Sequence, residues 1–452
     1  MNNYIQDVRA KYESGAPSEA KELIVKALED ASAEELVSLG ALAKEYSDYA
    51  SANNTYAQLV KTAPENPDYL NYYAMALIQS GDFEQADTHL REALSINDAH
   101  AHSYFNLSMI HQATTGDAMI SKIENLLQSP DITPSESYAF RLALGKFYDD
   151  AGDYDNAFAQ FQTAKQSAPV KYDHGAQQAF FKRLKTAFTK DLFEKNSKGG
   201  DPSPSPIFII GMPRSGSSLL ETMLAQDGRI SALGERIEMT LILQQLTKRM
   251  DAKKGYLELL PNMTADEFRQ CGAGYCRRLA PLSNGAERVT DKNVLNFLRA
   301  GFINLILPNS TMLHIRRDPI DTCLSCYFQT FDPAVFPFTF DLADIGKYYA
   351  LYADLMSYWN SVMPDRIIDV DYEQLINTPD NTIETLLTKI GSPPEKQSSA
   401  NEPKKTMVAT TSAWQARQPV YETSVNRWKN YEKHLAPLFA ALEQSGFNDS
   451  VE

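Results

Sequence analysis

The stretch IFIIGMPRSGSSLLETML, residues 207–224, decides the fold of this chain. Its first four residues are apolar and mostly β-branched, which is typical of a buried parallel strand. A loop bounded by Gly211 and Gly216 follows, and an apolar segment with helical spacing comes next. A strand, a glycine-containing loop and a helix in this order indicate a phosphate-binding loop at the edge of an α/β sheet.

The loop has the glycine spacing of a P-loop but lacks its lysine, because Ser217 stands at that place. In nucleoside triphosphatases this lysine contacts the β- and γ-phosphates, so its absence argues against such chemistry. Main-chain N–H groups around Gly216, the charge of Arg214 and the hydroxyls of Ser215, Ser217 and Ser218 would suit one dianionic group. The alternative is a tight strand-to-helix turn that binds nothing.

A second anion site is indicated by LHIRRDP, residues 313–319, where another apolar strand ends in two arginines. A helix is predicted from the proline onward. Ser325 lies eight residues beyond Arg317, about two helical turns along, so a guanidinium and a hydroxyl could clamp one phosphate. Alternatively, Arg317 pairs with Asp318 or Asp321 at the surface.

Around these motifs the chain alternates between strands and helices. Short apolar runs recur at 311–315 and 367–370, separated by helical stretches such as 294–307. This alternation predicts an α/β domain with a parallel sheet. The segment NSKGGDPSPSP, residues 196–206, is rich in Gly, Pro and Ser and is predicted to be a linker, which places the α/β domain at 207–452.

Residues 1–195 are predicted to be helical and contain an internal repeat. A Gly/Ser-Asp-aromatic turn, followed by an alanine, occurs at 47–49, 81–83 and 152–154. The first two turns are 34 residues apart, and the third lies 71 residues beyond the second. The pattern resembles the tetratricopeptide repeat, in which small alanines let paired helices approach and each pair packs on the next. A generic helical bundle with accidental spacing is the alternative.

Composition limits the class of protein and its partners. The chain has 452 residues, of which 43% are hydrophobic and 22% charged, as in ordinary globular proteins. Its net charge of −15 repels nucleic acid and anionic lipid, so an anionic ligand needs a local site. No apolar run is long enough for a membrane helix and no signal peptide is evident, which predicts a cytoplasmic protein without a membrane span. Four cysteines and seven histidines without metal-ligand spacing predict neither a disulfide framework nor a metal site.

The two anion motifs resemble the phosphosulfate-binding motifs of sulfotransferases, which use 3′-phosphoadenosine 5′-phosphosulfate (PAPS) as sulfuryl donor. Residues 213–218 resemble the 5′-phosphosulfate loop, and residues 317–325 resemble the 3′-phosphate motif. With the repeats in front, the chain is similar to the tyrosylprotein sulfotransferase branch and its bacterial relatives. The resemblance implies an α/β P-loop sulfotransferase domain with a parallel sheet, preceded by an all-α tetratricopeptide-repeat solenoid. It also implies PAPS as donor co-substrate and no metal.

The resemblance further implies roles for individual residues. Glu235 in LGER matches the catalytic base, which takes the proton of the acceptor hydroxyl. Lys292 in TDKN matches a lysine that stabilises the bridging oxygen as the bond to sulfur breaks. Ser412, with Thr411 as the alternative, matches a serine that contacts the sulfuryl group. The matches near the nucleotide and its 3′-phosphate are Tyr372 and Arg427.

The predicted function is therefore sulfuryl transfer from PAPS to an acceptor hydroxyl. The resemblance and a concave repeat domain favour a protein or peptide tyrosine, bound with help from the repeats. A carbohydrate, lipid or small-molecule hydroxyl is the alternative, because a fold does not fix a substrate. A P-loop kinase-like phosphotransferase and a catalytically dead repeat scaffold are the competing hypotheses. The sequence leaves the oligomeric state open, a homodimer included.

Overall fold

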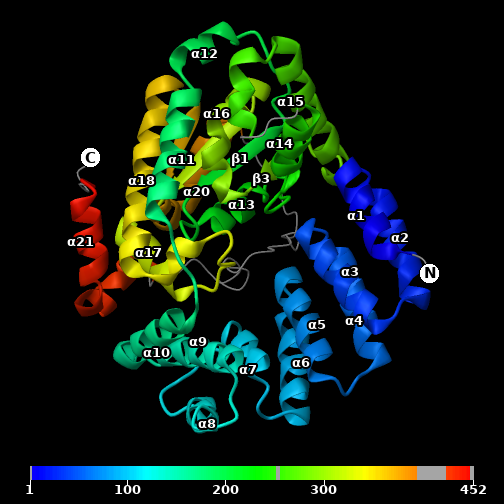
Figure 1. Cartoon of the computed structure of the whole chain (residues 1–452), viewed down its shortest axis with the longest axis vertical. Coiled ribbons are helices and arrows are strands. Elements are labelled where there is room, and N and C mark those ends of the chain that lie inside the picture. The colour runs from blue at the N-terminus through cyan, green and yellow to red at the C-terminus, as the bar shows by residue number, and fades with distance from the viewer. Residues whose placement is uncertain (1–2, 251–254, 394–423, 448–452) are drawn as a thin grey trace.

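The computed structural model describes residues 3–250, 255–393 and 424–447. Helices fill the first part of the chain, and a sheet flanked by helices fills the second (Figure 1). None of the helices in these three ranges is long and apolar enough to cross a lipid bilayer.

The N-terminal region is built from antiparallel helix pairs. The pairs that correspond to the predicted repeats are α3–α4, α5–α6 and α9–α10, and α1–α2 forms a further pair in front of them. The helices are α1 (Tyr4–Ser14), α2 (Pro17–Asp30), α3 (Ala33–Glu45), α4 (Tyr49–Thr62), α5 (Pro67–Ser80), α6 (Phe83–Ile96), α7 (Ala101–Ser108), α8 (Ala118–Leu126), α9 (Pro134–Asp150), α10 (Tyr154–Ser167), α11 (His174–Ala187) and α12 (Lys190–Lys195).

The turns of the repeat start the second helix of each pair. Asp48, Asp82 and Asp153 are the N-caps of α4, α6 and α10, and each carboxylate accepts a hydrogen bond from the main-chain N–H three residues on. The alanine four positions after each aspartate is completely buried. In α3, a Cβ at Gly40 would lie 2.5 Å from the ring of Tyr56, so the helices cross where one has no side chain. Between α6 and α9, the short α7 and α8 form the irregular unit that the longer spacing predicts.

Among the described residues, five strands form one parallel sheet in the order β2-β3-β1-β4-β5. This confirms the predicted parallel sheet. The strands are β1 (Pro206–Gly211), β2 (Ile230–Ser231), β3 (Arg288–Asp291), β4 (Thr311–Arg316) and β5 (Ile367–Asp371).

Helices cover both faces of this sheet. The α-helices are α13 (Ser217–Leu224), α14 (Glu238–Arg249), α15 (Ala265–Leu279), α16 (Ala300–Ile306), α17 (Pro319–Phe328), α18 (Leu342–Val362), α19 (Tyr372–Asn377), α20 (Pro379–Lys389) and α21 (Ala436–Gln444). The 3₁₀ helices are η1 (Tyr256–Glu258), η2 (Leu260–Asn262), η3 (Ala280–Leu282), η4 (Val294–Arg299), η5 (Pro337–Phe340) and η8 (Arg427–His434).

The central strand β1 is buried at every position, which explains why its residues 206–210 are all apolar. Ile207 and Ile209 pack into the layer formed with α13, α19 and α20. Phe208 and Ile210 pack into the opposite layer, which includes α14 to α16 and α18. Successive side chains of a strand point to opposite faces, so a strand covered on both faces needs apolar residues at every position.

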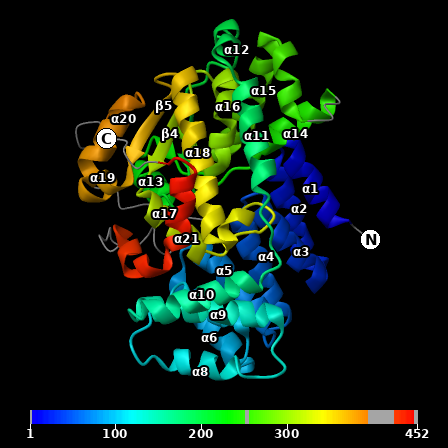
Figure 2. The same cartoon turned by 60° about the vertical axis from the view of Figure 1, so that its left-hand side comes forward.

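The repeat helices form an arc beside the sheet region, which they contact at both ends. In both views α1 lies beside α14, and α9 and α10 lie beneath α17 (Figure 1, Figure 2). At the second end the apolar core is continuous, since the rings of Phe161 in α10 and Phe328 in α17 stack with centroids 4.4 Å apart. Residues 196–206, which we propose as the domain boundary, thus separate helices from sheet along the chain but do not separate two cores.

Lys165, on α10, is a buried lysine within this shared core. Its Nζ donates a hydrogen bond to the main-chain oxygen of Gln329, 2.7 Å away, and lies 4.5 Å from the ring centroid of Phe340. Burial lowers the pKa of Lys165 to about 7.

This shift predicts how stability depends on pH. Between pH 7 and about 10, the unfolded chain holds a proton on Lys165 that the folded chain has released, so the unfolding free energy rises with pH in this window. We expect the unfolding free energy of the natural chain minus that of Lys165→Met to increase by up to about 1.4 kcal/mol per pH unit. Urea unfolding at pH 6.5, 8 and 9.5 measures this difference. A difference independent of pH would contradict the burial of a neutral lysine.

Candidate active site

The predicted site residues gather where the parallel strands end. In such sheets the carboxyl ends of neighbouring strands meet at one edge, which is where ligands bind. The phosphate loop follows β1, Lys292 follows β3, and Arg317 follows β4. Tyr372 follows β5, and Glu235 comes four residues after β2. Residues far apart in sequence are therefore brought to one edge.

The phosphate loop has a backbone that only a few residues could adopt. Gly216 has φ 100°, and a Cβ there would lie 2.3 Å from the ring of Tyr372, so glycine is required on two grounds. Arg214 also has a positive φ, 67°. The hydroxyl of Ser215 donates to the main-chain oxygen of Met212, 2.8 Å away, which stabilises the loop itself.

Helix α13 starts directly at the loop. Gly216 is its N-cap and supplies no side-chain hydrogen bond to the helix, whereas the buried Ser217 and Ser218 occupy its first turn. The N–H groups of a first helical turn carry partial positive charge and face outward along the axis, which favours an anion.

The two anion motifs are joined by direct contacts. Arg214 Nε donates to Ser325 Oγ, 3.1 Å away, and Arg317 Nη1 donates to the main-chain oxygen of Arg214, also 3.1 Å away. The guanidinium of Arg317 lies 5.0 Å from the ring centroid of Tyr372. The hydroxyls of Tyr372 and Ser424 are 2.9 Å apart, and the Ser424 main-chain oxygen accepts from Arg317. The structure thus brings together four of the predicted residues, Arg214, Arg317, Ser325 and Tyr372.

Three guanidinium groups, those of Arg214, Arg317 and Arg427, influence one another in this cluster. Burial lowers the pKa of Arg214 to about 10, and the positive charges of Arg317 and Arg427 act in the same direction. Asp321 lies 3.9 Å from Arg317 Nη2, too far for a good hydrogen bond. Arg317 Nε is buried, and within the described residues it has no hydrogen-bond partner. Buried cations with a free donor favour an anionic ligand.

Arg427 links this cluster to the repeat helices. Its guanidinium forms an ion pair with Asp149 of α9, and the hydroxyl of Tyr431 donates to the same carboxylate over 2.6 Å. Burial opposes ionisation of Asp149, but the charge of Arg427 outweighs it and the pKa of Asp149 is lowered. A contact of Arg427 with a 3′-phosphate stays a prediction. Ser412 and its alternative Thr411 lie outside the described residues.

Glu235 and Lys292 form an ion pair on the other side of the phosphate loop. Lys292 Nζ donates to Glu235 Oε1 over 2.9 Å. The lysine side chain is 1% exposed, whereas that of Glu235 is 52% exposed. A buried cation therefore orients a carboxylate that solvent or an acceptor can still reach.

A second carboxylate, the buried Glu221 of α13, binds residues that neighbour this pair in the sequence. Its Oε1 accepts from the main-chain N–H of Gly234 at 2.9 Å and from the hydroxyl of Thr290. Burial raises the pKa of Glu221, and the charge of Lys292 opposes that rise. Sequence reasoning missed Glu221, although a lone charge in the apolar segment LLETML was a usable signal.

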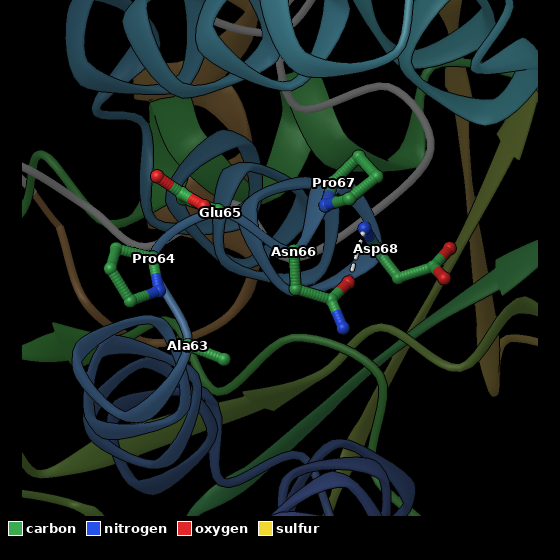
Figure 3. A pocket seen from close by; sticks show the side chains of 6 residues that line it. All are labelled: Ala63, Pro64, Glu65, Asn66, Pro67 and Asp68. Carbon is green, nitrogen blue, oxygen red and sulfur yellow. Dashed lines mark hydrogen bonds between the residues drawn. The ribbon is translucent and has the colours of Figure 1, made fainter.

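A separate hollow lies on the repeat region, at the turn between α4 and α5 (Figure 3). It has a volume of about 670 Å³ and is open to solvent. Its lining residues are Ala63, Pro64, Glu65, Asn66, Pro67 and Asp68. The lining comes from one turn and includes carboxylates but no cation, so it is unsuited to a phosphosulfate.

Comparison with known proteins gives two family matches. Residues 206–396 match the model of the sulfotransferase family, and residues 43–107 match that of the tetratricopeptide repeat. The first range contains the whole sheet, the phosphate loop, Glu235, Lys292 and Arg317. The second runs from α3 to α7 and includes two of the predicted turns.

The individual proteins that resemble this chain have low sequence identity to it. An uncharacterised protein of Aquifex aeolicus (strain VF5) is 28% identical over 392 residues, which are 85% of this chain and 51% of that protein, so the chain spans about half the length of this relative. The sulfotransferase domain of the Synechococcus olefin synthase is 14% identical, with a TM-score of 0.36 over 55% of this chain and 96% of that one. A sulfotransferase from Mycobacterium avium is 16% identical, with a TM-score of 0.33 over 74% of this chain and 97% of that one.

Proposed function

We propose that this chain, which carries a sulfotransferase family domain behind tetratricopeptide repeats, transfers a sulfuryl group from PAPS to an acceptor hydroxyl. The observation that carries the proposal is the joining of the two anion motifs through Arg214, Arg317 and Ser325, beside the pair of Glu235 and Lys292. PAPS carries anionic groups at the 5′ and 3′ positions of its ribose, and the site offers positive charge from two motifs.

The residues of the site suit this donor. The phosphate loop and the start of α13 would hold the 5′-phosphosulfate, with Arg214 as the charged side chain. Arg317, whose buried Nε lacks a partner among the described residues, would hold the 3′-phosphate. Gly216 lets the ring of Tyr372 pack directly against the main chain of the loop, which places Tyr372 next to the proposed anion site.

The chain's own groups then account for the chemistry. The donor supplies the sulfuryl group together with its leaving group. Glu235 would accept the proton of the acceptor hydroxyl, because its half-exposed carboxylate is held by Lys292 through one oxygen only in the contacts described. Lys292 would offset negative charge that develops on the leaving oxygen. Sulfuryl transfer resembles phosphoryl transfer in its loose transition state, so positioning and electrostatics supply most of the rate.

For the acceptor we propose a tyrosine of a protein or peptide. Support comes from the placement of the repeats, which contact the catalytic edge through Ser47 at one end and Asp149 at the other. Helical solenoids present extended concave surfaces that suit peptides. The hydroxyl of a carbohydrate, lipid or small molecule is the alternative, and an acceptor screen decides between them.

Isothermal titration tests the donor without knowledge of the acceptor. We expect adenosine 3′,5′-bisphosphate to bind about 30-fold or more tightly than AMP, because charge-assisted hydrogen bonds to the 3′-phosphate contribute roughly 2 kcal/mol or more. ATP with magnesium serves as the comparison for a phosphotransferase. A preference for ATP with magnesium, or equal affinity for bisphosphate and AMP, would overturn the proposed donor.

A further inference from the structure

The repeat region touches the proposed base directly. The hydroxyl of Ser47, in the turn between α3 and α4, donates a hydrogen bond to the main-chain oxygen of Glu235 over 2.6 Å. The two residues are 188 positions apart in the sequence. The contact therefore joins the first predicted repeat turn to the catalytic edge of the sheet.

Ser47 stands where the other repeat turns have glycine. Gly81 and Gly152 precede the capping aspartates of α6 and α10 with φ of 84° and 79°, and Ser47 occupies the same position with φ 58°. A left-handed backbone is unfavourable for a residue with a Cβ, and glycine avoids that strain. Serine at this turn is thus locally unfavourable, and its hydroxyl makes a contact that glycine could not make, the bond to Glu235.

The segment around Glu235 is held on its other side by the sheet. Lys292 N donates to the Gly234 oxygen over 2.9 Å, and Asn293 Nδ2 donates to the Arg236 oxygen over 3.1 Å. These bonds fix the residues before and after Glu235, whereas the carbonyl of Glu235 itself is held from the repeat by Ser47.

Tyr49, the first residue of α4, interacts electrostatically with the base. Burial, together with the negative charge of Glu235, raises the pKa of Tyr49 to about 12. The phenol therefore stays protonated at neutral pH close to the carboxylate.

Helix α1, whose Tyr12 hydroxyl donates to Asp48 beside this turn over 2.8 Å, is itself bonded to the sheet region. Arg278 of α15 and Gln245 of α14 both donate to the main-chain oxygen of Glu13, at 2.7 Å and 3.2 Å. A buried ion pair of Arg236 with Glu238 lies next to this contact, in a small cavity of about 60 Å³ that Ser47 also lines. The interface thus fixes the place from which Ser47 reaches Glu235.

We propose that Ser47 is a positioning residue, whose hydroxyl fixes the main chain of Glu235 and so aims its carboxylate. The repeat region then completes the active site in addition to any role in binding the acceptor. This inference rests on the proposed function, in which Glu235 is the base.

The test is Ser47→Gly in the full chain, because glycine is the residue that the repeat turn prefers. We expect a melting temperature close to that of the natural chain, since relief of the strain at this turn offsets the lost hydrogen bond. Amide hydrogen exchange in residues 232–237 should become about 5- to 10-fold faster, which corresponds to the loss of one hydrogen bond. With PAPS and a tyrosyl peptide, kcat should fall by a similar factor, while the affinity for adenosine 3′,5′-bisphosphate stays the same.

Two further variants separate positioning from general stability. Gly152→Ser makes the reverse exchange at a turn where a Cβ meets nothing within 4 Å, and it should leave exchange at 232–237 unchanged. Ser47→Asn should restore slow exchange and kcat, because asparagine tolerates positive φ and its amide can donate. Unchanged exchange in Ser47→Gly, or an equal effect of Gly152→Ser, would overturn the inference. If the bisphosphate does not bind the natural chain while Ser47→Gly still loosens 232–237, the proposed function fails and the contact stands.

Discussion

Replacing Glu235 by glutamine is expected to lower kcat for sulfuryl transfer by about 10²- to 10⁴-fold, the usual effect of removing a general base. Glutamine keeps the shape of the side chain, and its amide oxygen can still accept from Lys292 Nζ, which is 2.9 Å from the carboxylate in the natural chain. What it loses is the ability to take a proton. Because the contacts that the described residues make with Glu235 come from Lys292 and Ser47 and not from the arginine cluster, the affinity for adenosine 3′,5′-bisphosphate should change by less than about threefold. Steady-state transfer and isothermal titration measure the two quantities.

A matched control is Glu92→Gln. Glu92 lies on α6 of the repeat region, its side chain is 47% exposed, and its Oε2 lies 3.3 Å from Nδ1 of His89. This exchange removes the same charge from a similarly exposed site and should leave kcat unchanged. Equal losses of nucleotide affinity and kcat in Glu235→Gln would show that the glutamate organises the donor site and is not the base.

The predictable parts of the fold are those whose signals are local. The strand, loop and helix of residues 206–224 lie within one short stretch, and α17 begins at Pro319 as predicted because proline is favoured in the first turn of a helix. The repeat turns could also be predicted from the sequence, since each aspartate caps a helix that starts at the next residue.

Strand β3 could not be found in this way. Arg288 and Asp291 stand at its ends, and charged ends do not indicate a buried strand. In the fold, Arg288 donates to the main-chain oxygen of Ile390 at 2.7 Å, and Asp291 accepts from the hydroxyl of Tyr275 at 2.7 Å. These hydrogen bonds offset the cost of burying the two charged side chains. Their partners lie up to 102 residues away, so no local sequence pattern contains them. The predicted helix at 294–307 divides into η4 and α16.

The site shows the same division between local and distant signals. The motifs identified Arg214, Arg317 and Ser325, whereas the bonds among them follow from the meeting of β1 and β4. The partner of Arg427 is an aspartate in α9, which only the docking of the repeats could reveal. Contacts of Ser47 have a weak sequence signal, a serine where the repeat prefers glycine. The roles of all these residues toward the donor stay predictions.

Replacing Arg317 by alanine is expected to weaken binding of adenosine 3′,5′-bisphosphate by about 30- to 100-fold, or roughly 2–3 kcal/mol, while AMP binds nearly as before. The guanidinium is 9% exposed, lies over Tyr372 and keeps a buried Nε free of partners among the described residues, so a 3′-phosphate would receive a largely desolvated charge. Arg317→Lys, which keeps the charge but not the planar guanidinium group, should recover part of the loss.

The neighbouring Arg316 is the control: its side chain is 45% exposed and lies 3.6 Å from Asp369, so Arg316→Ala should leave both affinities unchanged. If Arg317→Ala weakened AMP as much as the bisphosphate, the arginine would act by supporting the main chain of Arg214, and the 3′-phosphate would have to be held elsewhere.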